Sequence, residues 1–169
     1  QTKDKRLVLA IEGKSGSGKS YLSNYLQTTM NASIISTDDF FLTDEQKEVQ
    51  TAIGDYINYK LLEKEVMSKI RNASSVTYHC YDCQENKFEL KTTKLTQIAI
   101  VEGVYSYNKH LTKYYDYLIF VDVLPEEQDR RLRERNSGPI LERFINEWIP
   151  KENLYFKTFN ILGTADVIV

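Results

Sequence analysis

A glycine-rich segment near the start of the chain carries a spacing typical of phosphate binding. Residues 13–20 read Gly-Lys-Ser-Gly-Ser-Gly-Lys-Ser, which fits Gly, four variable residues, Gly, Lys and then Ser or Thr. Such a loop lets backbone N–H groups converge on an anion. The alternative is a flexible turn that only joins a strand to a helix. We expect ATP as cofactor, bound by Gly13, Lys14, Ser15, Gly16, Ser17, Gly18, Lys19, Ser20 and Tyr21.

Two side chains of this segment have specific chemistry. Lys19 is expected to reach the β- and γ-phosphates, and the hydroxyl of Ser20 to help hold Mg²⁺. Lys14 either contacts phosphate or remains exposed to solvent.

Acidic residues follow three apolar segments of the sequence. Asp38 and Asp39 come after 34–35, Glu102 after 98–101, and Asp122 after 118–121. Ligands of open parallel sheets bind beyond the carboxyl ends of strands, and a kinase needs carboxylates near the acceptor hydroxyl and the metal. Asp38 is the first choice as acceptor-side base, with Asp39 or a simple capping role as alternatives. Spacing alone does not separate Glu102 from Asp122 as the metal ligand.

The pattern of apolar segments predicts an α/β fold with a central parallel sheet between two layers of helices. Short continuous apolar runs, typical of buried strands, occur at 7–11, 33–36, 98–101, 118–121 and 167–169. Helical spacing covers 19–30, 58–72, 126–135 and about 139–159. Segments 76–81 and 87–90 suit a hairpin, and the polar stretch 43–55 suits a surface loop.

Length and composition set further limits. The chain of 169 residues with net charge -2 fits a single domain spanning 1–169 and has no global basic field, so no nucleic-acid partner is expected. It has no long apolar run and a polar start, which predicts a cytoplasmic protein without a membrane partner. The start at Gln1 rather than Met suggests a trimmed or processed N-terminus. The two cysteines, Cys80 and Cys83, are expected to be reduced thiols.

Two motifs beyond the glycine-rich loop resemble the uridine kinase and phosphoribulokinase-like family, which includes nicotinamide riboside kinases. Residues 35–41, Ile-Ser-Thr-Asp-Asp-Phe-Phe, resemble its Ser-x-Asp-x-Phe-Tyr/Phe motif, and 101–105, Val-Glu-Gly-Val-Tyr, resemble its Val-Glu-Gly-Ile motif. The resemblance covers nearly the whole chain and implies a P-loop NTPase fold. It implies that Asp38 is the catalytic carboxylate and that Glu102, rather than Asp122, lies near the metal. The metal site would then contain Ser20, Glu102 and Asp38.

The resemblance also implies where the phosphoryl acceptor binds. Tyr81-Asp82 is similar to a Tyr-Asp-Phe segment whose aspartate contacts the ribose, on a hairpin at about 76–91. The chain departs from that pattern at 83–87, Cys-Gln-Glu-Asn-Lys, where uridine kinases have His-Ser-Arg, so the acceptor need not be uridine or cytidine. A turn role is the alternative for Asp82. The predicted substrate-binding residues are Asp38, Asp39, Phe40, Tyr81, Asp82 and Glu102.

An arginine-rich stretch resembles the lid of this family. Segment 126–139 contains the Arg-Leu-x-x-Arg pattern, in which Arg131 and Arg135 lie four residues apart on one helical face. Together with Asp38 and Lys19 they are predicted catalytic residues, bracing the transferred phosphoryl group when the lid closes. A solvated charged face is the alternative. Near the C-terminal end, Trp148, Glu152, Tyr155 and Phe156 resemble the ending of short bacterial members.

The expected function is transfer of the γ-phosphate of ATP to a hydroxyl of a small molecule. The alternatives are a nucleotide-dependent switch and a non-catalytic nucleotide-binding protein. A guanine-specific switch would carry Asn-Lys-x-Asp, and the Asn-Lys pairs at 86–87 and 108–109 lack the aspartate.

Overall fold

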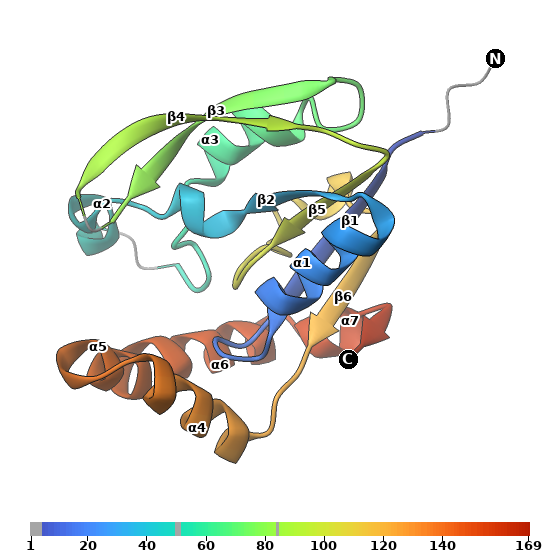
Figure 1. Cartoon of the computed structure of the whole chain (residues 1–169). Coiled ribbons are helices and arrows are strands. Elements are labelled where there is room, and N and C mark those ends of the chain that lie inside the picture. The colour runs from blue at the N-terminus through green and yellow to red at the C-terminus, as the bar shows by residue number, and fades with distance from the viewer. Residues whose placement is uncertain (1–4, 50–51, 84) are drawn as a thin grey trace.

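A five-stranded parallel sheet forms the centre of the molecule (Figure 1). The computed structural model describes residues 5–49, 52–83 and 85–169. The strand order is β2-β5-β1-β6-β7, which confirms the predicted α/β fold. The strands are β1 (Leu7–Gly13), β2 (Ser33–Ser36), β5 (Ile98–Glu102), β6 (Tyr117–Val121) and β7 (Val167–Ile168).

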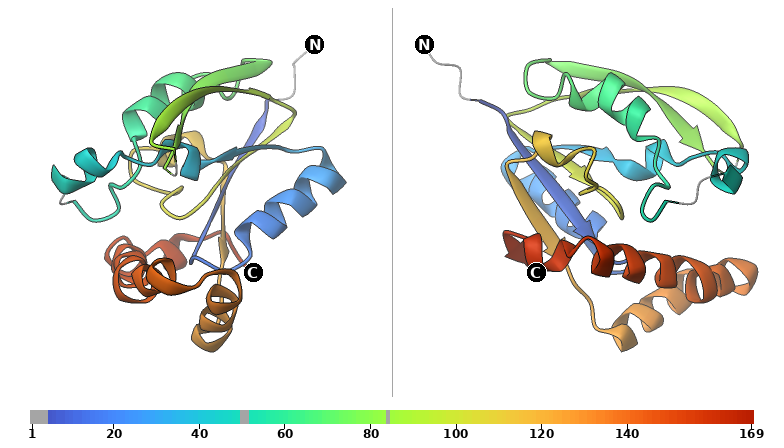
Figure 2. Two further views of the ribbon diagram at one scale, coloured as in Figure 1. Left: turned by 60° about the vertical axis from the view of Figure 1, so that its left-hand side comes forward. Right: turned by 180° about the vertical axis from the view of Figure 1, so that it is seen from behind.

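Both faces of this sheet are covered, which explains why its strands are apolar without alternation. Helix α1 (Lys19–Met30) covers one face, where Ile11, Ile100 and Val121 are buried. The opposite face carries the larger apolar cluster, whose members include Val8 and Tyr155. Figure 2 shows α1 on one side of the strands and the C-terminal helices running along another side.

A two-stranded antiparallel hairpin lies beyond β2. It consists of β3 (Ser75–Asp82) and β4 (Lys87–Lys94), paired in register from Ser75↔Lys94 to Asp82↔Lys87. The predicted hairpin is therefore confirmed, and it is longer than the expected segments. Figure 1 shows it on the same side of the sheet as α3 (Tyr59–Leu62).

The segment 43–55 is not entirely a loop, contrary to expectation. It contains a short helix, α2 (Asp44–Val49). The backbone N–H of Thr43 donates to the Gln46 side chain at 3.0 Å, and the N–H of Gln46 donates to the Thr43 hydroxyl at 3.3 Å. This reciprocal capping box stabilises a helix start without apolar periodicity. Residues 50 and 51, within the predicted loop, lie outside the described part.

The remaining helices follow the predictions with local irregularities. Helix α3 continues into a π-helical turn at Glu63–Met67, within the predicted 58–72 helix. The predicted helix at 139–159 is interrupted by a π-helical turn just before Pro150, whose missing N–H cannot complete a regular ladder. No described helix could span a membrane. The C-terminal helical elements are α4 (Pro125–Arg135), α5 (Gly138–Arg143), the π-turn Phe144–Trp148, α6 (Ile149–Thr158) and α7 (Ile161–Thr164).

Candidate functional site

The glycine-rich loop joins β1 to α1 and depends on glycine at three positions. Gly13, Gly16 and Gly18 have φ values of +149°, +75° and +106°, which L-residues rarely adopt. A Cβ on Gly13 would also lie 2.2 Å from the carbonyl oxygen of Val121. The first turn of α1 has no side-chain cap, so its N–H groups remain available to an anion.

Lys19 lies beneath the loop. Its ammonium donates to the carbonyl oxygens of Gly13 and Lys14, both at 2.8 Å, and the residue is only 8% exposed. Burial lowers the pKa of Lys19, and nearby carboxylates oppose that shift. Those carboxylates, in order of influence, are Glu12, Glu152, Glu102 and Asp38.

Strand register brings two predicted acids to the same edge of the sheet as Lys19. Ser36 at the end of β2 is paired with Glu102 at the end of β5, and the Ser36 hydroxyl donates to the Glu102 carboxylate at 3.1 Å. Asp38 follows in a 3₁₀ turn, Thr37–Phe40. It keeps an exposed surface, yet the surrounding protein displaces enough water to raise its pKa. Desolvation and the charge of Asp38 raise the pKa of Glu102.

Gly103 fixes the relation between these two acids. Its φ is +137°, and a Cβ there would lie 2.0 Å from the Thr37 hydroxyl oxygen. Thr37 donates to the Glu102 carbonyl at 3.2 Å. The turn that carries Asp38 therefore packs directly on the backbone that follows Glu102.

Lys14 and Asp122 are engaged with each other. Their ion pair measures 2.8 Å, and Lys14 also reaches the Val123 carbonyl at 3.3 Å. In this arrangement each of the two side chains already has a charged partner. Asp122 therefore differs from Glu102, whose electrostatic neighbours are Asp38 and Lys19.

The donor set around Glu102 fits Mg²⁺ of the kind shared with a nucleotide. Within the described ranges, no group of three or more His, Cys, Asp or Glu side chains could hold an ion. Mg²⁺ typically uses one or two carboxylates together with substrate phosphates, and Ser20, Asp38 and Glu102 could supply the protein share. Cys80 and Cys83 do not form a disulfide with each other.

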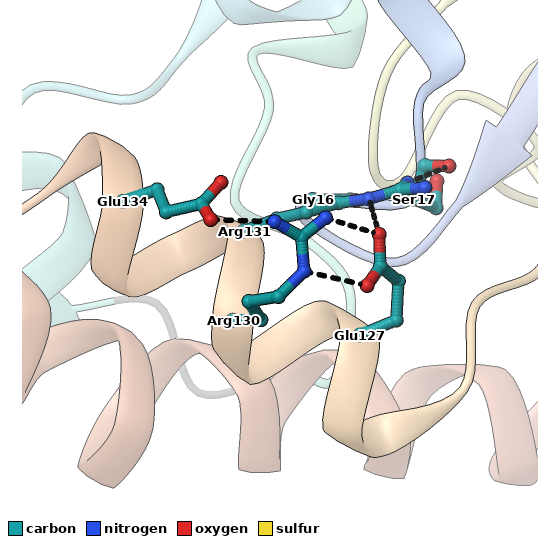
Figure 3. Close-up of polar contacts among 6 residues, drawn as sticks. All are labelled: Gly16, Ser17, Glu127, Arg130, Arg131 and Glu134. Carbon is teal, nitrogen blue, oxygen red and sulfur yellow. Dashed lines mark hydrogen bonds and ion pairs between the residues drawn. The ribbon is translucent and has the colours of Figure 1, made fainter.

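Helix α4 docks onto the outside of the loop (Figure 3). Arg131 donates to the carbonyl oxygens of Gly16 and Ser17 at 3.1 and 3.0 Å, and Glu127 holds its guanidinium at 2.7 Å. Arg135 is exposed and has no polar partner within the described residues.

A buried amide of the same helix adds to this contact. Gln128 donates to the Ser15 carbonyl at 2.8 Å and is only 6% exposed. The contacts of Gln128 and Arg131 tie three consecutive carbonyl groups of the loop to α4.

Two buried glutamates at the site were not predicted as site residues. Glu12 accepts from the backbone N–H groups of Gly13, Tyr105 and Tyr107 at 3.0–3.1 Å, and burial raises its pKa to about 7. Glu152 on α6 accepts from the N–H and hydroxyl of Ser15 at 2.9 and 2.5 Å. The sequence signal of Glu12 is a charge between an apolar strand and the loop, whereas Glu152 was noted only within the resemblance of the C-terminal residues to short bacterial members.

The predicted acceptor-side residues divide into two groups. Asp39 binds the hairpin, accepting from Tyr78 at 2.9 Å and Lys91 at 2.8 Å. Phe40 is 1% exposed and stacks on Tyr78, so it belongs to the core and presents little surface to a ligand.

Tyr81 and Asp82 lie at the hairpin turn. The Tyr81 hydroxyl donates to the Asn86 side chain at 2.8 Å, and Asp82 accepts from the Glu85 backbone at 3.1 Å. These contacts match the alternative of a turn role for Asp82.

A pocket of about 550 Å³ lies beside the loop. Its lining includes Gly18, Tyr21, Arg131 and Asp122. Tyr21 is 80% exposed there, which leaves an aromatic face available to a ligand.

No family model and no curated protein matches the sequence. Solved structures do match. A possible uridine kinase from Bacillus stearothermophilus is 21% identical with a TM-score of 0.75, covering 99% of this chain and 90% of its own. Phosphoribulokinase from Rhodobacter spheroides (13% identity, TM-score 0.65) covers 98% of this chain and 70% of its own. D-glycerate 3-kinase from Cryptococcus neoformans is 16% identical with a TM-score of 0.54, and the match covers 91% of this chain and 81% of the kinase. The chain therefore has the fold of the uridine kinase and phosphoribulokinase-like P-loop kinases.

Proposed function

We propose that the chain is a small-molecule kinase that transfers the γ-phosphate of ATP to a hydroxyl group. The observation that carries this proposal is the convergence of Lys19, Asp38 and Glu102 at one edge of the sheet beside a glycine-rich loop. Each residue comes from a different strand end or helix start, at the edge where open parallel sheets bind their ligands.

The donor would bind along the loop. Ser17 supports this role, because its hydroxyl is buried and has no hydrogen-bond partner within the described residues. Phosphate oxygens would offer such a hydroxyl an acceptor. Lys19 would contact the terminal phosphates after exchanging its carbonyl partners, and Tyr21 would border the rest of the nucleotide. Bound Mg²⁺ would neutralise phosphate charge, with Ser20 and Glu102 orienting it.

The acceptor hydroxyl would lie at Asp38. Its carboxylate would accept the hydroxyl proton as the new O–P bond forms, and a raised pKa brings a base closer to the pKa at which proton transfer is efficient. Arg131 would brace the phosphoryl group from α4 after leaving the loop carbonyls, and Arg135 would reach it if segment 126–139 closes as a lid.

Asp38→Asn tests the proposal. This isosteric change should reduce acceptor-dependent ADP release by about 100-fold or more, because general-base catalysis typically contributes about 10²–10⁴-fold. Binding of a fluorescent ATP analogue should persist. Asp129→Asn, which removes an exposed carboxylate of α4, is the matched control and should retain activity. Full turnover by Asp38→Asn would remove Asp38 from this role, and ADP release independent of acceptor would favour the switch alternative.

A further inference from the structure

The charge around Lys19 restricts which acceptors the site can take. Four carboxylates interact with this single buried ammonium: Glu12, Glu152, Glu102 and Asp38. Bound Mg²⁺ and the arginines of α4 would add positive charge, but the negative charge of the triphosphate would neutralise it. Glu12 is fully buried and its pKa is raised to about 7, so the negative charge that an acceptor would meet at Asp38 comes from Asp38, Glu102 and Glu152.

Basic side chains on the acceptor side are already neutralised. Lys91 of β4 reaches Asp39 at 2.8 Å, and Lys151 of α6 reaches Glu147 at 2.8 Å. Lys94 lies two residues before Thr96, whose N–H contacts Ser33 at the amino end of β2, away from Asp38.

Other basic groups of the hairpin are paired as well. His79 contacts Glu65 at 2.9 Å and Lys87 contacts Glu89 at 3.0 Å. Three internal residues lie outside the described ranges: Gln50, Thr51 and Gln84. Their side chains are uncharged at neutral pH. Among the described cations of the hairpin and α6, Lys94 and Lys157 have no carboxylate partner. Lys94 is the last residue of β4, and Lys157 is an exposed residue in the last turn of α6.

Aromatic side chains pack around the segment that follows Glu102. Tyr105 follows Glu102-Gly103 and has a φ of +71°, a rare conformation for a bulky residue. Its ring packs 5.2 Å from that of Tyr56, and the Lys151 ammonium lies 5.4 Å from the Tyr56 ring. Aromatic faces attract cations and repel anions.

The hydroxyl of Tyr105 is available for hydrogen bonding. The residue as a whole is 6% exposed. Its hydroxyl oxygen makes no hydrogen bond to another described residue, and it is not one of the fully enclosed oxygens that lack a partner, so it reaches the surface. Glu152 is the strongest charged influence on this phenol. A hydroxyl or ammonium of the acceptor could pair with the phenol and carboxylates together, whereas a carboxylate or phosphate would meet like charge.

We propose that the acceptor is an uncharged or cationic hydroxyl compound, and that the Asp38–Glu102–Glu152 carboxylates, with Lys91 held by Asp39, exclude phosphorylated and carboxylated acceptors. This inference rests on the proposed kinase function. The names of the compared kinases include an uncharged acceptor, uridine, and a carboxylate, D-glycerate, so the fold leaves the acceptor's charge open.

A charge-matched panel tests this exclusion. The probes are uridine and its monophosphate, ribose and ribose phosphate, and glycerol, D-glycerate and aminopropanediol, each with Mg·ATP. We expect kcat/KM for the best uncharged or cationic probe to exceed that of its anionic counterpart at least about ten-fold, since like charges in a partly desolvated site repel strongly. Preferred turnover of an anionic probe, or no turnover of any uncharged or cationic probe while ATP binds, overturns the inference. Failure to bind Mg·ATP would instead refute the proposed function.

A variant tests the same inference from within the site. Asp39→Asn removes the ion pair of Lys91 at the residue that follows Asp38 in the chain, so the ratio of anionic to uncharged turnover should rise about ten-fold even if overall activity falls. The control Asp129→Asn also breaks an ion pair, with Arg133 on the exposed face of α4, and should leave the ratio unchanged. An unchanged ratio in Asp39→Asn would show that Lys91 does not control acceptor charge and would overturn the proposal.

Discussion

Glu12 should make the stability of the protein depend on pH in a direction that can be measured. Two effects compete at this fully buried carboxylate. Desolvation favours the neutral form, whereas three backbone N–H donors and the Lys19 ammonium favour the charged form. Tyr155 adds a fourth donor at 3.3 Å. Desolvation is the largest effect and raises the pKa from its ordinary 4.5 to about 7.

The sign and size of the effect follow from linkage. Because the folded pKa lies above the unfolded one, the folded state binds the proton more tightly between these values. The contribution is fully present below the unfolded pKa and is lost as pH rises through about 7. The difference between the two pKa values corresponds to about 3 kcal/mol, of which roughly 2.5 kcal/mol falls between about pH 5 and pH 8.

Urea denaturation of the wild type and Glu12→Gln at both pH values isolates this contribution from other titrating groups. At about pH 5 the folded wild type carries a neutral carboxyl, both of whose oxygens can still accept hydrogen bonds, whereas the NH2 group of the variant cannot accept, so the variant should be less stable there. Its deficit should shrink by roughly 2.5 kcal/mol at about pH 8. A deficit independent of pH, or one that grows with pH, would refute the reasoning and show that the N–H donors outweigh desolvation.

Three further substitutions test parts of the structure. Gly103→Ala should destabilise the fold by about 2 kcal/mol or more and reduce activity, because its Cβ would meet the Thr37 hydroxyl at 2.0 Å; normal urea stability would contradict this packing. Gln128→Leu should lower stability by about 1 kcal/mol by leaving the partly buried Ser15 carbonyl without this donor, and an unchanged melting temperature would argue against the contact. Arg71→Met removes hydrogen bonds to a carboxylate and two backbone carbonyls and should cost about 2 kcal/mol near neutral pH. Arg71 lowers the pKa of Asp116, so the loss of stability in Arg71→Met should become smaller as Asp116 is protonated under acid conditions. A loss of stability that does not change with pH would refute that pairing.

The fold could be predicted from sequence because its signals are local. The central parallel strands are largely buried on both faces and therefore appear as continuous apolar runs, and the glycine-rich loop marks where the first strand ends. Helix α2 was missed although its signal is also local. Thr43 and Gln46 form a capping box, but the helix is too polar to show periodicity.

The site was harder to predict because its contacts join distant segments. Glu152 lies 137 positions from Ser15, and Gln128 lies 113 positions from it. No spacing rule connects such residues, and their roles follow only from how α4 and α6 pack beside the loop. The Lys14–Asp122 ion pair is similar, since it depends on the pairing of β1 with β6.

The most direct test follows the transferred phosphoryl group itself. Incubation with ATP labelled at the γ-phosphate, Mg²⁺ and the uncharged hydroxyl compounds should place the label in an organic phosphate ester. Its formation should depend on the acceptor concentration and be lost in Asp38→Asn. Recovery of all label as inorganic phosphate, at a rate that no acceptor changes, would contradict the account.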